Sequence, residues 1–79
     1  MSKDKIFEIV KKYIIEIMGE EDEIDINKSL RYYGTNSIDR ADIIMSIIEE
    51  IGCKIPLIEF GNLKNIQGIV DVFYSKTNV

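Results

Sequence analysis

The sequence contains no histidine and no tryptophan, and it has only one cysteine and one proline. Without histidine there is no ordinary general base at neutral pH, and no nucleophile–base pair is visible, so the sequence gives little support to an enzyme. A lone cysteine, Cys53, excludes a disulfide within the chain, which fits a reducing compartment. We expect Cys53 to be a small packing residue and not a nucleophile, because no other cysteine or histidine is present to activate it.

Long apolar runs are also missing. No stretch reaches the roughly 18 apolar residues that a membrane span needs, and the first residues alternate in charge without an apolar signal core. We therefore expect a cytoplasmic protein with no membrane partner.

The acidic residues at 20–23 could bind a cation loosely, but they lack the twelve-residue pattern of an EF-hand, so we expect no metal site.

The charge is acidic and the hydrophobic content is ordinary. A net charge of −4 argues against binding to nucleic acid, and basic protein partners are expected instead. With 46% hydrophobic residues the chain can build a core, and 79 residues correspond to a single domain spanning 1–79.

Apolar residues recur at three- and four-residue spacing in three segments. The pattern predicts helices over residues 3–18 and 37–51, closed by Gly19 and Gly52, and over 66–75 after an Asn65 cap. Residues 57–60 follow Pro56 and favour one short helical turn, which could roof the core or line the mouth of a crevice; core roofing is the interpretation that we adopt. We therefore predict an all-α fold, a small bundle of three longer helices and one short helix, with fraying after residue 75.

The connection from residue 22 to 36 is long enough that it should be pinned by its own apolar residues. The candidates are Ile24, Ile26, Leu30 and one of the two tyrosines, Tyr32 or Tyr33.

Residues 34–39 join this polar loop to the most apolar run in the chain. Gly34 is expected to supply an unusual backbone angle, and Asn36 and Asp39 have the spacing of a capping box. Ser37 then opens the helix with a solvent-facing hydroxyl. A phosphate on that oxygen would gain about 0.3–1 kcal/mol from the helix dipole. Ser37 could, however, merely help to cap the helix.

The apolar surface of the helix predicted at 37–51 is wider than one core requires. Ile43, Ile44, Ile47 and Ile51 share one side, while Ala41, Met45 and Ile48 extend the apolar surface beyond it. Either part of this surface is exposed for a partner, or the core simply surrounds the helix.

Several positions together resemble the acyl carrier protein family, over nearly the whole chain. They are Ser29-Leu30, Gly34, Asn36-Ser37-Ile38-Asp39, Met45, Glu49-Glu50, Ile55-Pro56 and the last helix. The resemblance implies an acyl-carrier-protein-like bundle and a non-catalytic role, with 4′-phosphopantetheine attached to Ser37 by a phosphopantetheinyl transferase that uses coenzyme A. The thiol of that group would hold acyl chains as thioesters. The usual Asp-Ser-Leu is replaced by Asn36-Ser37-Ile38, which keeps the cap but removes one charge and changes the fit to a generic transferase.

In the family, this second helix recognises partner enzymes. The positions that we expect to recognise partners are Asn36, Ile38, Asp39, Arg40, Asp42, Met45, Ile48 and Glu49. Arg40 is included on the condition that it does not pair with a nearby carboxylate. Because Ile48 stands where an acid is common, we expect recognition to rely less on charge and more on apolar fit.

One subgroup of the family is especially similar in residues 36–42, 54–60 and 64–66. These runs look like the free-standing donor acyl carrier proteins of polyketide β-branching cassettes. The resemblance implies a monomer that carries an acetyl or propionyl thioester to a hydroxymethylglutaryl (HMG)-CoA-synthase-like enzyme, with an acyltransferase and a decarboxylating ketosynthase as further partners.

Two alternatives stay open. The chain could be a carrier of another pathway, such as fatty-acid synthesis, peptide synthesis or D-alanyl transfer. It could also be an unmodified helical adaptor, in which the apolar face of the second helix binds a partner and Ser37 only caps.

Overall fold

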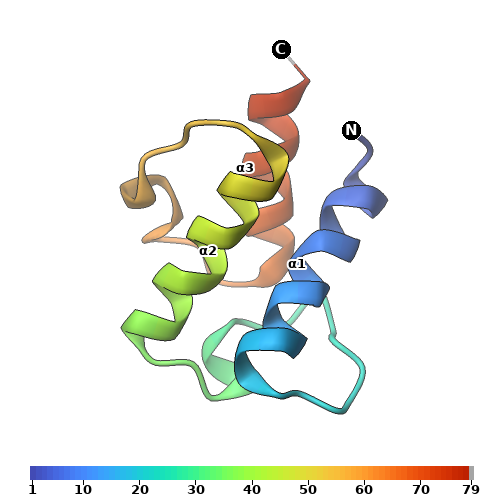
Figure 1. Cartoon of the computed structure of the whole chain (residues 1–79), viewed down its shortest axis with the longest axis vertical. Coiled ribbons are helices and arrows are strands. Elements are labelled where there is room, and N and C mark those ends of the chain that lie inside the picture. Colours follow the sequence, from blue (N-terminus) through green and yellow to red (C-terminus); the bar gives the residue numbers. More distant parts are fainter. Residues whose placement is uncertain (79) are drawn as a thin grey trace.

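The computed structural model describes residues 1–78, which form three α-helices and two short 3₁₀ helices (Figure 1). In chain order these elements are α1 (Lys3–Met18), η1 (Arg31–Tyr33), α2 (Ser37–Ile51), η2 (Leu57–Phe60) and α3 (Ile66–Thr77). The predicted all-α fold is confirmed, and so are the predicted bounds of α1, α2 and the short turn. Figure 1 places the start of α1 and the end of α3 at one end of the bundle, and the long first loop and the start of α2 at the other.

Local signals in the sequence set the helix ends. A side-chain oxygen caps the start of each α-helix, supplied by Ser2, Asn36 and Asn65. Gly19 and Gly52 end α1 and α2 in the left-handed conformation, with φ of 65° and 77°. Because these caps act within one turn of the chain, they could be predicted without knowledge of the tertiary structure.

The last helix runs two residues further than predicted. The Thr77 hydroxyl donates to the Phe73 carbonyl at 2.8 Å, and the Asn78 side-chain amide donates to the carbonyl oxygens of Tyr74 and Met1, both at 3.0 Å. The predicted fraying from Lys76 onward is therefore wrong for residues 76 and 77, which are helical. A contact with the other end of the chain helps to hold this helix end, which no local pattern reveals. Val79, also predicted to fray, lies outside the described residues.

The core is built from the apolar stripes of the three α-helices, with contributions from the long loop and from the segment before η2. Its buried members are Ile6, Ile9, Val10, Ile14, Ile24, Leu30, Ile43, Ile44, Ile47, Ile55, Ile66, Ile69, Val70 and Phe73. Phe73 is the largest and is fully buried; its ring lies 5.2 Å from the ring of Phe60 in η2, centre to centre. Isoleucine favours strands, but a helical spacing lets these side chains pack on one face, and that packing decides the structure.

The long loop is pinned to the bundle, as predicted. Ile24 and Leu30 are buried, and Ile26 is half-buried. Of the two tyrosines, Tyr33 is the anchor: it is half-buried and its hydroxyl accepts the Asp25 N–H at 2.6 Å. Tyr32 is 65% exposed.

Two backbone hydrogen bonds tie this loop to α3. The N–H groups of Ile66 and Gln67 donate to the carbonyls of Lys28 and Ile26 at 2.8 and 2.9 Å. The first N–H groups of a helix have no acceptor within the helix. The loop carbonyls therefore serve as acceptors for the first two N–H groups of α3. The loop that leads to α2 is thereby fixed at both its backbone and its side chains.

A polar contact links α1 to the end of α2. The Glu50 carboxylate accepts a hydrogen bond from the Tyr13 hydroxyl at 2.6 Å and forms an ion pair with Lys12. The hydrogen bond from Lys12, with a further one from Tyr13, lowers the pKa of Glu50. The hydrogen bond between Lys12 and Glu50 also raises the pKa of Lys12. Glu49-Glu50 is one of the runs that carry the family resemblance, but the Glu50 carboxylate is bonded to α1.

We predict that Glu50→Gln lowers the free energy of unfolding at neutral pH and that the loss shrinks as the solution is acidified. A carboxylate whose pKa is lowered in the folded state contributes stability above its unfolded pKa, and this contribution is lost as the pH falls through the folded pKa. Urea unfolding of both proteins at pH 7 and at pH values below the ordinary carboxyl range measures the effect. Glu49→Gln is the matched control, because Glu49 is also exposed but, unlike Glu50, forms no side-chain hydrogen bond or ion pair among residues 1–78. An equal loss at every pH would contradict the prediction.

Candidate functional site

Ser37 is the first residue of α2 and is exposed. The start of α2 lies at the end of the bundle opposite the end of α3 (Figure 1). The turn before it is firmly held. Gly34 adopts φ of 85°, as its predicted role requires, and ends η1. Thr35 is only 7% exposed, and its carbonyl accepts a hydrogen bond from the Arg40 guanidinium at 2.8 Å. The Ser37 hydroxyl is thus presented to solvent from a fixed position.

The predicted capping box is confirmed. The Asn36 side chain accepts the Asp39 N–H at 2.8 Å, and the Asp39 carboxylate accepts the Asn36 N–H at 3.0 Å. Within the described chain, the N–H groups of Ser37 and Ile38 have no hydrogen-bond partner. Two free donors at the positive end of a helix fit a phosphate ester on the Ser37 oxygen. The residues present therefore suit a phosphopantetheine group at this position.

Four of the predicted recognition residues form an exposed stripe along α2. They are Ile38, Asp42, Met45 and Glu49, spaced by four, three and four residues. We call this set the α2 stripe. Ile38 and Met45 are 71% and 55% exposed, which is unusual for apolar side chains of this size. The alternative that the core surrounds the whole helix does not hold for this face.

The other four predicted recognition residues are engaged in the fold. Asn36 and Asp39 bond to each other in the capping box, and Ile48 is half-buried against the core. Arg40 forms no ion pair in the part of the chain that the structure describes; its guanidinium donates to the Thr35 carbonyl and is half-buried.

The short helix η2 departs from its predicted role. Phe60 packs on Phe73 and does cover the core, but Ile58 is 85% exposed and Leu57 is 45% exposed. In a 3₁₀ helix residues i and i+3 share a face, so Leu57 and Phe60 point to one side and Ile58 to another. The expectation that η2 simply roofs the core is therefore wrong for Ile58. The apolar run at 57–60 already contained this residue, but its exposure depends on how η2 sits on α2 and α3.

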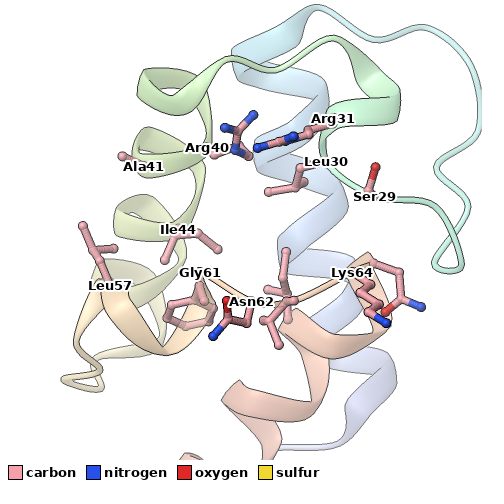
Figure 2. Close-up of a pocket in the computed structure, with 14 residues that line it drawn as sticks. Ser29, Leu30, Arg31, Arg40, Ala41, Ile44, Leu57, Gly61, Asn62 and Lys64 are labelled. Atoms are coloured by element: carbon pink, nitrogen blue, oxygen red, sulfur yellow. The ribbon is translucent and has the colours of Figure 1, made fainter.

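A pocket of about 590 Å³ lies between α2, η1, η2 and the start of α3 (Figure 2). Part of its lining is apolar and includes Leu30, Ile44 and Phe60. Three cations also line it, Arg31, Arg40 and Lys64, and none of its 14 lining residues is acidic. Arg31 and Lys64 were not predicted as site residues, since they are far apart along the chain and follow no helical spacing with Arg40.

Three other features bear on the chemistry. Burial raises the pKa of the Cys53 thiol, which keeps it protonated at neutral pH and makes it a poor nucleophile. Within residues 1–78, no cluster of acidic or cysteine side chains is placed to hold a metal ion. No helix in the described part of the chain combines the length and apolar character needed to cross a membrane.

Comparison with known proteins agrees with this geometry. The family "Phosphopantetheine attachment site" matches residues 8–73, a segment that includes Ser37. The chain is 37% identical over 78 residues to the polyketide biosynthesis acyl-carrier-protein AcpK of Bacillus subtilis (strain 168), covering 96% of this chain and 95% of that protein. It is also 28% identical over 81 residues to an acyl carrier protein of Petrotoga mobilis, covering 100% of this chain and 95% of the relative.

A solved structure is similar in fold and in sequence. It is described as the HMG synthase of the curacin biosynthetic pathway in complex with acetyl donor-ACP. The matched chain superposes with a TM-score of 0.89 at 38% identity, over 96% of this chain and 100% of its own length. Together with the family match over most of the chain, these similarities show that this protein belongs to the acyl carrier proteins, the family that bears a phosphopantetheine attachment site.

Proposed function

We propose that this acyl carrier protein is modified on Ser37 by 4′-phosphopantetheine. The observation that supports the assignment is the exposed Ser37 hydroxyl at the first position of α2, beside two backbone N–H groups that have no partner among residues 1–78. A phosphopantetheinyl transferase would move the group from coenzyme A to the Ser37 oxygen, forming a phosphodiester. The free backbone donors and the helix dipole would then stabilise its negative charge.

The chain itself acts as a carrier and not as a catalyst. The sequence has no histidine, and the Cys53 thiol has a raised pKa, so neither supplies an activated nucleophile. Partner enzymes perform the chemistry on the acyl thioester. Tethering serves them because it replaces free diffusion of the acyl group with a high effective concentration at whichever enzyme docks.

The acyl group is a short one, acetyl or propionyl, and the receiving partner is an HMG-CoA-synthase-like enzyme of polyketide β-branching. This proposal is supported by the similarity to a polyketide acyl carrier protein and to a chain solved with HMG synthase. An acyltransferase and a decarboxylating ketosynthase remain predicted partners. A single-domain, monomeric and cytoplasmic protein is likewise what the sequence predicts.

The docking surface for the synthase is the α2 stripe together with Ile58. Asp42 and Glu49 carry negative charge that would steer the carrier toward a basic patch, as in other electrostatically guided complexes. The exposed side chains of Ile38, Met45 and Ile58 supply the apolar contact. Apolar residues that are buried on docking tend to carry most of the binding energy.

The attachment site is tested by intact-protein mass after incubation with coenzyme A, magnesium and a broad-specificity phosphopantetheinyl transferase. We expect the wild type and Ser75→Ala, a control at another exposed serine, to gain one phosphopantetheine each. Ser37→Ala should gain none, because the accepting oxygen is gone. If folded wild-type protein gains nothing with several transferases, the carrier function fails and an unmodified adaptor becomes the better explanation.

The donor role is tested by transfer of acetyl from the loaded protein to a purified HMG-CoA-synthase-like enzyme. We expect Met45→Glu and Ile58→Glu to lower kcat/KM roughly tenfold or more, which corresponds to about 1.4 kcal/mol of lost docking energy. Ile15→Glu is the matched control, since Ile15 is 45% exposed and lies on α1, not on α2 or η2. Unchanged transfer by Met45→Glu and Ile58→Glu would exclude this surface. No transfer by the wild type, with acceptance by fatty-acid or peptide-synthesis enzymes, would favour a carrier of another pathway.

A further inference from the structure

Arg40 is a cation in the first turn of α2, where the positive end of the helix dipole disfavours positive charge. Its guanidinium forms no ion pair with an acidic side chain among residues 1–78. The ion pairs found there are Lys3–Asp71, Lys11–Glu8, Lys12–Glu50 and Lys76–Glu59. A positive group held without a counter-charge at the start of a helix is suited to bind an anion that joins it there.

The Arg40 guanidinium is directed back toward the start of α2. Its Nη1 donates to the Thr35 carbonyl at 2.8 Å and to the Thr35 hydroxyl at 3.4 Å. Thr35 precedes Ser37 by two residues, and side chains on a helix lean toward its N-terminus. Figure 2 shows the Arg40 side chain reaching from α2 toward η1. The bonds to Thr35 therefore hold the positive group beside the turn that carries Ser37.

Ser37 and Arg40 are three residues apart, so they are neighbours on one face of α2, with about 5–6 Å between their Cβ atoms. A phosphate on the Ser37 oxygen thus comes within reach of a guanidinium that is turned back toward the helix start. Arg40 uses only Nη1 in the described chain, which leaves its Nε and Nη2 donors free. Paired donors of this kind match the oxygens of a phosphate.

We propose that Arg40 binds the phosphodiester that joins the phosphopantetheine arm to Ser37. This inference rests on the proposed modification of Ser37. The N–H groups of Ser37 and Ile38, which have no partner among residues 1–78, would donate to the phosphate from the helix start. The free guanidinium donors would contact it from the side of η1 and supply the positive charge that the backbone groups lack.

This contact sets the direction in which the arm leaves α2. Arg40 is two residues from both Ile38 and Asp42, and residues two apart lie on opposite sides of a helix. A phosphate held by Arg40 is therefore turned away from the α2 stripe. An enzyme docked on the stripe must offer donors of its own to draw the phosphate across, which favours partners that carry such donors over those that do not.

The contact is tested by urea unfolding of the unmodified and phosphopantetheinylated forms of the wild type and of Arg40→Gln. We expect the modification to lower the unfolding equilibrium constant roughly threefold more in the wild type than in the variant, because only the wild type forms the charged hydrogen bond. A packing loss caused by Arg40→Gln is present in both forms of the variant, so it cancels in this comparison. Added salt should reduce the difference.

Lys54→Gln is the matched control, because it removes the same charge from an exposed position outside α2. Its response to the modification should equal that of the wild type. The ³¹P resonance of the phosphodiester should also be unchanged in Lys54→Gln and shifted in Arg40→Gln.

A second measurement needs no substitution, so it holds even if Arg40→Gln does not fold. Arg31 and Arg40 are the arginines of the chain, and their guanidinium Nε–H groups can be followed by ¹H–¹⁵N NMR. We expect the Arg40 resonance to move when Ser37 is modified, and to move more than that of Arg31.

The outcomes separate this inference from the function on which it rests. If the protein takes up one phosphopantetheine but the modification changes the stability of the wild type and of Arg40→Gln equally, the carrier function stands and the Arg40 contact is overturned. An Arg40 resonance that stays in place overturns the contact too. An effect of Lys54→Gln as large as that of Arg40→Gln also overturns it, because net charge would then account for the difference. A folded protein that accepts no phosphopantetheine would overturn both.

Discussion

The structure depends on α2 presenting three different faces at once. One face, with Ile43, Ile44 and Ile47, is buried and holds the bundle together. A second face is the α2 stripe, which is exposed and which we assign to partner docking. The third face begins at Ser37 and continues along the pocket wall through Arg40. A period of 3.6 residues per turn separates these faces, so one helix can anchor the core, bear the arm and meet an enzyme.

The position of α2 is in turn fixed by the loop before it. The long loop buries Ile24 and Leu30, and its backbone accepts hydrogen bonds from the first residues of α3. The capping box and the bond from Arg40 to Thr35 then fix the last step from the loop into the helix. Ser37 is consequently exposed on a backbone that these contacts hold in place. This suits a residue that must be recognised by a transferase and then support a moving arm.

Electrostatic roles are divided among the acidic residues. Asp39 and Glu50 bond within the fold, where they cap a helix and join α1 to α2. Asp42 and Glu49 face solvent and are available to partners. The cations Arg31, Arg40 and Lys64 gather on the pocket side of α2. A small acidic carrier can thereby present acids to basic partners on one face while its pocket on another face is lined by cations.

The sequence by itself determined the features that depend on residues within one or two helical turns of each other. Apolar spacing and the caps at Gly19, Asn36 and Gly52 predicted the helices, and the same local pattern identified Ser37 as the exposed start of α2. Family resemblance extended this to the phosphopantetheine group. Tertiary structure alone decided the features that join distant segments, such as the anchoring of Tyr33 and the pairing of Glu50 with Lys12.

Two further features depended on how distant segments pack together. Ile58 is exposed because of how η2 sits against α2 and α3, although its neighbours in sequence suggested a core role. The pocket cations come from η1, α2 and the segment before α3, and no spacing along the chain relates them. Capping hydrogen bonds and the spacing of apolar residues depend on residues that are close in sequence, so they can be predicted from it. Contacts between distant side chains depend on how the whole core packs.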